Sequence, residues 1–153
     1  MQKIVTSLWF EDQAEEAVDF YASIFKEVVV KNVVRFEENA RGEKGKVMTI
    51  SFELNGQQFI ALNGRMHFTF NPAISFSISC ETQDEIDHYW NRLSEGGKPG
   101  QCGWLEDKFG VSWQVVPTVL GELMKNSDHE KVKRVTKALL QMKKLDIGQL
   151  ITA

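Results

Sequence analysis

Residues 102–117 read CGWLEDKFGVSWQVVP and combine a tight turn, a short strand and one amide inside an apolar run. Residues 107–110 predict the turn, because an aspartate side chain accepts backbone hydrogen bonds and glycine tolerates the backbone angles of turns. VSWQVV then predicts a strand, in which successive side chains alternate between two faces. Gln114 therefore shares a face with Ser112, opposite the face of Trp113. This placement raises the question of what the amide contacts.

The first 63 residues predict a β-α-β-β-β unit. KIVTSLWF and EVVVKNVVRF are rich in β-branched and aromatic residues, as strands are, and the polar loop EENARGEKG follows the second. Between them, apolar residues recur at helical spacing: Ala14, Ala17, Val18, Tyr21, Ile24 and Phe25. Asp12 and Glu15 have the spacing of a capping box at the start of this helix. VMTISFEL and QQFIAL flank Asn55-Gly56, a strong signal for a hairpin.

The second half of the chain repeats this order. AISFSISC predicts a strand, and Thr82 with Glu85 forms a capping box ahead of a second helix. The helix has an apolar face made of Ile86, Trp90 and Leu93. Residues 11–15 align with residues 81–85 at the same capping position. The two halves are therefore expected to be copies of one unit, the second with shorter strands.

A third segment follows the second unit. Ser127 and Glu130 predict a helix start, and apolar residues then repeat at helical spacing up to about Leu145. The opposite side of this helix is basic, as is typical of a solvated face. We expect an α+β fold in one domain, residues 1–153, with unit one at about 1–63, unit two at about 74–117 and a C-terminal helical segment at about 118–150.

Composition excludes several classes of partner. The formal charge is −3, with acidic and basic residues interspersed, so we expect no nucleic acid and no membrane surface as partners. No apolar run approaches the roughly 20 residues that span a bilayer, and the N-terminus has no signal-peptide pattern. Cys80 and Cys102 lack the spacing of metal ligands and form no disulfide framework. These features predict a cytoplasmic location.

Several segments together resemble the vicinal oxygen chelate superfamily, and within it the PhnB-like branch. They are LWF followed by QAEEAVDFY and SIF, then HFTFNPAISFSI, ETQDEIDHYW, LSEGGKP and CGWLEDKFGVSWQVVP. The resemblance implies two β-α-β-β-β units that form cupped mixed sheets with helices on the outer face. It also implies a small ligand on the concave face and a homodimer, since dimers are common in the superfamily. Members of this branch often carry the label 3-demethylubiquinone-9 3-methyltransferase.

The resemblance also implies where a metal would be held. Metal-dependent members have a glutamate on the last strand four residues after the turn glycine, and Gln114 stands at that position here. The corresponding position of unit one is Ile60, the first-strand ligand falls at Val5 or Thr6, and its second-unit counterpart falls at about Ser75. Divalent ions need imidazole or carboxylate ligands that this set lacks. We therefore expect no metal and no cofactor.

The candidate ligand-binding residues are those expected to face into the cup: Ser7, Trp9, Ser75, Ser77, Trp104, Ser112 and Gln114. His67 and Gln114 are the weak candidates for catalysis, since an imidazole exchanges protons near neutral pH. His88 and His129 are expected at the surface. Glu53 and Asn63 end strands and reach either a ligand or a neighbouring loop.

Two classes of function remain. The first is metal-independent binding of a small planar or amphipathic metabolite, because a few polar groups among aromatic walls are typical of such sites. The alternative is an enzyme that acts on a small molecule, by methyl transfer to 3-demethylubiquinone, by acid-base chemistry, or by metal-dependent chemistry of the glyoxalase or dioxygenase type. A typical methyl-donor site requires a glycine-rich loop after the first strand, and this sequence has no such loop there.

Overall fold

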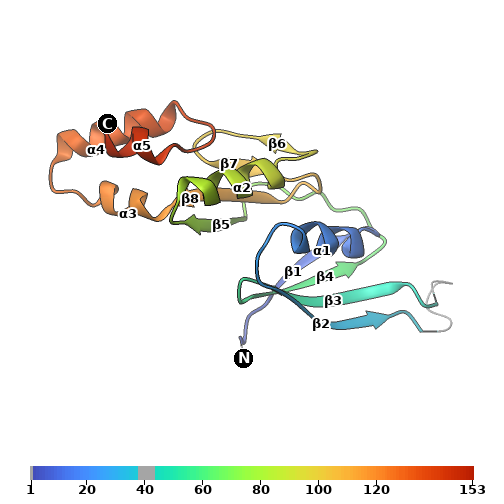
Figure 1. Ribbon diagram of the computed structural model, residues 1–153. Coiled ribbons are helices and arrows are strands. Elements are labelled where there is room, and N and C mark those ends of the chain that lie inside the picture. The colour runs from blue at the N-terminus through green and yellow to red at the C-terminus, as the bar shows by residue number, and fades with distance from the viewer. Residues whose placement is uncertain (1, 38–43) are drawn as a thin grey trace. The chain divides into compact units, whose positions relative to one another are not determined.

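A computed structural model describes residues 2–37 and 44–153 (Figure 1). The polar loop expected after the second strand lies mostly outside these residues. The chain divides into two compact units, Met1–Thr69 and Phe70–Ala153, which are considered one at a time below.

Unit one has the predicted β-α-β-β-β order. Its elements are β1 (Thr6–Phe10), α1 (Ala14–Ala22), β2 (Val28–Arg35), β3 (Val47–Leu54) and β4 (Gln57–Asn63). The strands form one sheet in the order β1-β4-β3-β2, in which β1 runs parallel to β4 and the other pairs are antiparallel. The hairpin at Asn55-Gly56 is confirmed, with φ of 47° and 84° in the left-handed region that this dipeptide favours.

The helix α1 covers one face of this sheet (Figure 1) and packs against β3 and β4. Four residues of its predicted apolar face, Ala14, Ala17, Val18 and Tyr21, are confirmed as buried on the helix. Ile24 and Phe25 are buried too, but they follow the helix, which ends at Ala22 and not at Phe25 as predicted. All six meet the sheet residues that alternate toward the helix: Leu8, Phe10, Ile50, Phe52, Leu54, Phe59 and Ala61. We call the other side of each sheet its open face.

The predicted capping box at Asp12 is wrong. The residue before α1 is Gln13, whose side chain makes no capping hydrogen bond. Instead, Asn63 at the end of β4 accepts a hydrogen bond from the backbone N–H of Ala14 at 2.9 Å and donates to the carbonyl of Val47 at 3.1 Å. The cap is therefore supplied from a residue far away in the sequence, which a local spacing rule does not detect.

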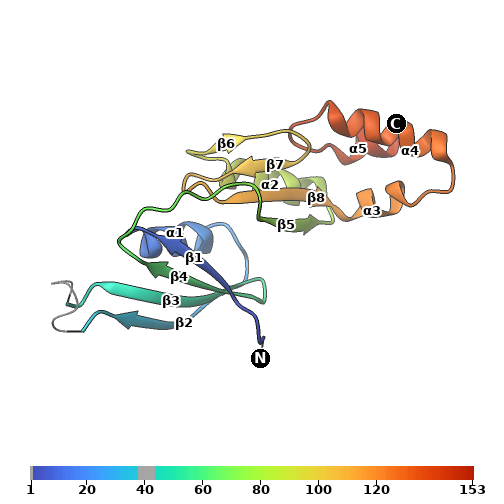
Figure 2. The same ribbon diagram turned by 180° about the vertical axis from the view of Figure 1, so that it is seen from behind.

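Unit two repeats the topology, so the duplicated order is confirmed. Its elements are β5 (Ser75–Cys80), α2 (Gln83–Leu93), β6 (Lys98–Pro99), β7 (Trp104–Glu106) and β8 (Ser112–Pro117). The sheet order is β5-β8-β7-β6, with β5 parallel to β8. Seen from behind, β8 passes in front of α2 (Figure 2), so the helix covers the far side of this sheet.

The capping box of α2 is also confirmed. The Oγ1 atom of Thr82 accepts a hydrogen bond from the backbone N–H of Glu85 at 3.2 Å, and the Glu85 carboxylate accepts one from the N–H of Glu81 at 2.7 Å. The predicted apolar face of α2 is buried. It packs against the sheet side of Leu105, Trp113 and Val115, which are 3%, 2% and 0% exposed.

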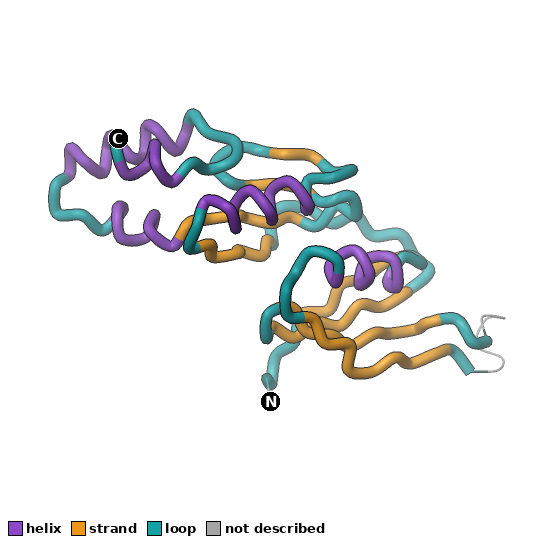
Figure 3. Tube along the Cα trace, in the orientation of Figure 1, coloured by secondary structure: helices purple, strands orange, loops and turns teal. Residues whose placement is uncertain are grey.

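The C-terminal segment is helical but not one continuous helix, because loops separate its helices (Figure 3). The helices are α3 (Thr118–Met124), α4 (His129–Leu140) and α5 (Ile147–Ile151). The predicted cap at Ser127 is wrong by one residue, because Asp128 accepts the N–H groups of Glu130 and Lys131. The segment has its own apolar cluster, centred on Val135, Met142, Leu145 and Leu150.

The predicted helix continues to about Leu145, yet α4 ends at Leu140. The chain leaves the helix because its backbone is used elsewhere in unit two. The carbonyls of Met142 and Lys143 accept hydrogen bonds, both of 2.8 Å, from the N–H groups of Cys102 and Gly103. In the part of the chain that the structure describes, no helix has the length and apolar character to span a bilayer.

Candidate functional site

The open face of the unit-two sheet carries two rows of polar and aromatic side chains. Directly paired residues of neighbouring strands share a face. One row is Ser75 on β5, Ser112 on β8 and Glu106 on β7. The adjacent row is Ser77, Gln114 and Trp104 on the same three strands. Four of the predicted residues, Ser75, Ser77, Ser112 and Gln114, thus lie beside the predicted Trp104.

These side chains face away from α2 because the alternate positions fill the core. Ser77 is exposed, Ser75, Trp104 and Gln114 are partly exposed, and Ser112 is 4% exposed. An amide can therefore occur in this otherwise apolar strand, because the Gln114 side chain lies on the open face while the neighbouring Trp113 and Val115 face the core. Its Nε2 atom donates to the Oγ of Ser75 at 2.9 Å, a diagonal contact between the two rows.

The start of β8 is held by the buried carboxylate of Asp107, which is 2% exposed. Its Oδ1 atom accepts hydrogen bonds from the backbone N–H groups of Phe109 (2.9 Å) and Val111 (3.0 Å). Its Oδ2 atom accepts one from the indole of Trp113 at 2.9 Å. The predicted turn is confirmed, and the aspartate fixes the register from which Ser112 and Gln114 follow.

The loop before β7 positions Trp104. Cys102 and Gly103 have left-handed backbone angles, with φ of 58° and 84°. Their N–H groups are bound by the segment after α4, as described above, and the carbonyl of Gly103 accepts the N–H of Val115 at 2.8 Å. Trp104 is therefore attached both to β8 and, through its preceding loop, to the C-terminal segment.

The other two predicted ligand-binding residues, Ser7 and Trp9, lie on the open face of unit one. They pair with Ile60 and Leu62 on β4, so this part of the face is mainly apolar. The indole of Trp9 donates to the carbonyl of Met66 at 2.9 Å and meets Phe68 edge to face, with ring centroids 5.3 Å apart. Thr6 pairs with the buried Phe59 and so lies on the helix face.

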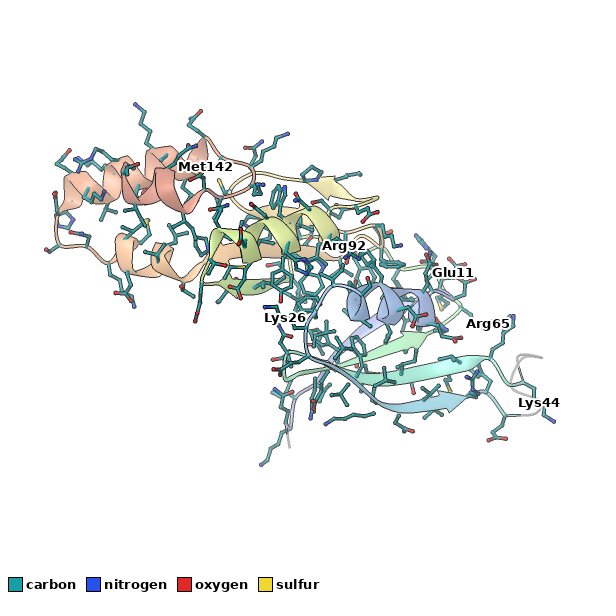
Figure 4. The ribbon with its side chains drawn as sticks, in the orientation of Figure 1. Glu11, Lys26, Lys44, Arg65, Arg92 and Met142 are labelled. Atoms are coloured by element: carbon teal, nitrogen blue, oxygen red, sulfur yellow. The ribbon has the colours of Figure 1, made fainter. Side chains whose placement is uncertain are left out.

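His67 is exposed at one end of unit one. Its Nδ1 atom is 3.4 Å from the Oε2 of Glu11, and its Nε2 atom is 3.4 Å from the Oγ1 of Thr69. Glu11 also lines a polar cavity of about 500 Å³. The other lining residues are Asp12, Glu15, Lys46, Val47, Asn63 and Arg65, and Figure 4 labels Glu11 and Arg65 at this end. His88 and His129 are exposed on helices.

The residues at the positions implied for a metal do not fit one. Gln114, Ser75 and Ile60 offer an amide, a hydroxyl and an aliphatic chain, and the amide nitrogen of Gln114 is engaged with Ser75. Over residues 2–37 and 44–153, no three His, Cys, Asp or Glu side chains group as metal ligands do. A divalent ion would lose its hydration shell here without carboxylate or imidazole ligands in return.

Glu106 is the site residue that sequence reasoning missed. It shares the open face with Trp104 and Ser112, and it is partly exposed. The alternation of WLE contains the signal, because a residue two positions after Trp104 must share its face. In the sequence, however, this acid lies next to the aspartate that forms the turn, where a charged residue is typical of a loop.

Comparison with known proteins gives a consistent set of relatives. A family described as 3-demethylubiquinone-9 3-methyltransferase matches residues 2–116. A PhnB protein from Bacillus cereus is 40% identical, with a TM-score of 0.69 over 76% of this chain and 100% of that one. A Pseudomonas aeruginosa protein shares the fold at 20% identity, with a TM-score of 0.64 over 76% and 98% of the two chains.

A more distant structure shares the fold alone. A mutant of the fosfomycin resistance protein FosX from Listeria monocytogenes is 15% identical, with a TM-score of 0.59 over 82% of this chain and 100% of that one. That protein was crystallised with Mn(II) and 1S,2S-dihydroxypropylphosphonic acid. No curated protein matches this chain.

Proposed function

We propose that this chain, which belongs to the 3-demethylubiquinone-9 3-methyltransferase family in the PhnB-like branch of the vicinal oxygen chelate superfamily, binds a small planar or amphipathic metabolite without a metal ion. The proposed site is the open face of the unit-two sheet. The cytoplasmic location and the homodimer remain predictions that accompany this proposal.

The observation that carries the proposal is the composition of that face. Four uncharged polar side chains and one indole lie on neighbouring strands, above a core that buries the alternate positions. Ligand sites in proteins combine apolar or aromatic walls with a few placed hydrogen-bonding groups. Trp104 offers the aromatic wall, while the serines and the carbonyl oxygen of Gln114 offer hydrogen bonds.

Metal chemistry of the kind suggested by FosX does not fit this chain. The Mn(II) reported with that protein is a property of that protein. Here the amide of Gln114 and the hydroxyl of Ser75 bind each other. The proposal therefore contains no step at a metal.

The family description also implies a methyl donor, and the residues do not fit that group either. Donor sites of the nucleotide-binding kind use a glycine-rich loop between a strand and the following helix of a parallel sheet. Here β1 is followed by Glu11, Asp12 and Gln13, and the sheet is mixed. The glycines of residues 96–103 lie in the loops around β6, after a helix rather than after a strand.

The proposal is tested by screening neutral aromatic alcohols and amides against the ¹⁵N-labelled full chain in EDTA. We expect shifts of the Trp104 indole and of the Gln114 side-chain amide. The Gln114→Leu variant should weaken binding about tenfold, whereas the surface control Gln141→Leu should leave it unchanged. Binders whose shifts map elsewhere on the chain would contradict the proposed site.

A second candidate function is acid-base catalysis at His67. The observation in its favour is the chain of contacts from Glu11 through His67 to Thr69, because a carboxylate beside an imidazole orients it for proton transfer. If this group acts, turnover of a ligand found in the screen is lost in His67→Gln and retained in His129→Gln. Product formation would be followed by mass spectrometry.

A further inference from the structure

Glu106 places a carboxylate beside the proposed ligand site. It lies on β7 two residues after Trp104, so both side chains leave the same face of the sheet. Among the residues that the structure describes, no side-chain hydrogen bond or ion pair involves the carboxylate of Glu106, whose backbone pairs with Ser112 on β8. Lys98 lies opposite it on β6, yet Lys98 is exposed and no ion pair joins the two.

Unit one provides an internal comparison. Glu53 pairs with Gln58 across the β3–β4 hairpin, as Glu106 pairs with Ser112 across β7 and β8, so the two acids occupy matching places in the duplicated sheet. Glu53, however, has partners. Lys31 forms an ion pair with it and holds the pKa of its carboxyl below the ordinary value, and Gln58 donates to it at 3.3 Å.

The carboxylate at this position is therefore paired within unit one, at Glu53, whereas in unit two the Glu106 carboxylate has no described partner. A hydrogen bond from an ammonium group to a carboxylate is charge-assisted and is roughly twice as strong as one between neutral groups. The neighbouring indole of Trp104 attracts the same kind of group through its negatively polarised face. The serines and the carbonyl oxygen of Gln114 accept hydrogen bonds, as an ammonium group requires.

We infer that the ligand of this site carries an ammonium group that lies at Glu106, against Trp104. The planar part of the ligand then lies over the uncharged polar side chains of the same face, which are Ser75, Ser77, Ser112 and Gln114. This inference rests on the proposed function and adds the charge of the ligand. A phosphonate, such as the one crystallised with FosX, would meet a like charge here.

The test uses three probes that share one ring and differ in charge: 2-phenylethylammonium, 2-phenylethanol and 3-phenylpropionate. Each is titrated into the ¹⁵N-labelled full chain in EDTA at pH 7, and Kd is read from the Trp104 indole signal. We expect the ammonium to bind at least fivefold more tightly than the alcohol, and the propionate to bind most weakly.

Two matched variants identify the residue responsible. Glu106→Gln and Glu53→Gln each remove one negative charge, so they change the net charge of the chain equally. Glu106→Gln should reduce the preference for the ammonium to less than twofold, while Glu53→Gln keeps it. In urea unfolding, Glu53→Gln should lower the midpoint because Lys31 loses its partner, whereas Glu106→Gln should not.

The outcomes separate this inference from the proposal on which it rests. If all three probes bind equally to the wild type, the inference is overturned and the proposed binding site stands. If Glu53→Gln removes the preference as completely as Glu106→Gln, the effect is one of overall charge and the inference is again overturned. If none of the probes binds, both the inference and the proposed function are contradicted.

Discussion

At the scale of single residues, Asp107 is the side chain on which the site most depends for its shape. Its carboxylate accepts three hydrogen bonds, two from the backbone and one from Trp113. Asp107→Ala leaves these donors without an acceptor, and each buried unsatisfied donor costs about 1–3 kcal/mol. We expect the free energy of unfolding in urea to fall by about 3 kcal/mol or more.

Asp107→Asn is the matched control, because it retains the oxygen that caps the turn and loses the acceptor for the indole. Its loss should be about half that of Asp107→Ala. Equal stability of Asp107→Ala and the wild type would contradict the role given to this residue.

Cys80 should be chemically inert in the folded protein. It is fully buried, and burial together with the negative charge of Glu85 raises the pKa of its thiol to about 11. Thiolate is the reactive form, so alkylation by iodoacetamide at pH 8 should be roughly a hundredfold slower than for the unfolded chain. Peptide mass spectrometry with and without urea measures this rate, and Cys102, which is only partly buried, should react first.

At this scale the sequence predicts a residue's face better than its partner. Strand alternation correctly separates Ser112 and Gln114 from Trp113, because the period of a strand is fixed by backbone geometry. It does not predict that Gln114 bonds Ser75, or that Asn63 rather than Asp12 caps α1. Both contacts join residues that are far apart in the chain.

At the scale of elements, the side chain of Gln83 in α2 forms two hydrogen bonds with the C-terminal segment. Its Nε2 atom donates to the carbonyl of Leu145 at 3.0 Å, and its Oε1 atom accepts the N–H of Ile147 at 2.9 Å. Gln83→Ala should lower the free energy of unfolding by about 1–2 kcal/mol and increase hydrogen exchange in residues 142–153. The exposed Gln141→Ala is the control, and similar exchange in the two variants would contradict the assignment.

The ion pair between Asp87 and Lys144 adds a pH-dependent contact to the same junction. The Lys144 ammonium lies 2.9 Å from Asp87, and its hydrogen bond, followed by one from Gln83, lowers the pKa of the Asp87 carboxyl. A lowered pKa in the folded state gives stability that is complete above the ordinary pKa of aspartate and is lost as the pH falls through the lowered value.

Lys144→Met should therefore destabilise the protein at pH 7, by a modest amount because both groups are partly exposed. The difference from the wild type should shrink as urea unfolding is repeated at pH values below 4. A difference that stays constant down to pH 2 would show that the pair does not titrate as described.

The elements themselves follow from local signals where those signals agree. Periodicity, the box at Thr82 and the Asn55-Gly56 turn correctly predict the β-α-β-β-β order of both units. The end of α4 at Leu140 has no comparable signal, because residues 141–145 keep a helical pattern. Their backbone is taken up instead by hydrogen bonds to Cys102 and Gly103.

At the scale of the whole molecule, the family match ends at residue 116, so α3 to α5 lie beyond the common fold. Their attachment to the loop before Trp104 connects this addition to the proposed ligand face. We expect changes that loosen the C-terminal segment, such as Gln83→Ala in α2, to weaken ligand binding without touching the ligand.

The central claim is that the chain binds a small organic molecule without a metal ion. Native mass spectrometry of the protein as purified, before and after EDTA, tests this claim most directly. We predict a dimer that carries an organic molecule, retains it through EDTA and holds no divalent metal. One Mn, Fe, Ni or Zn ion per chain, with the organic molecule lost when EDTA removes the ion, would contradict the account.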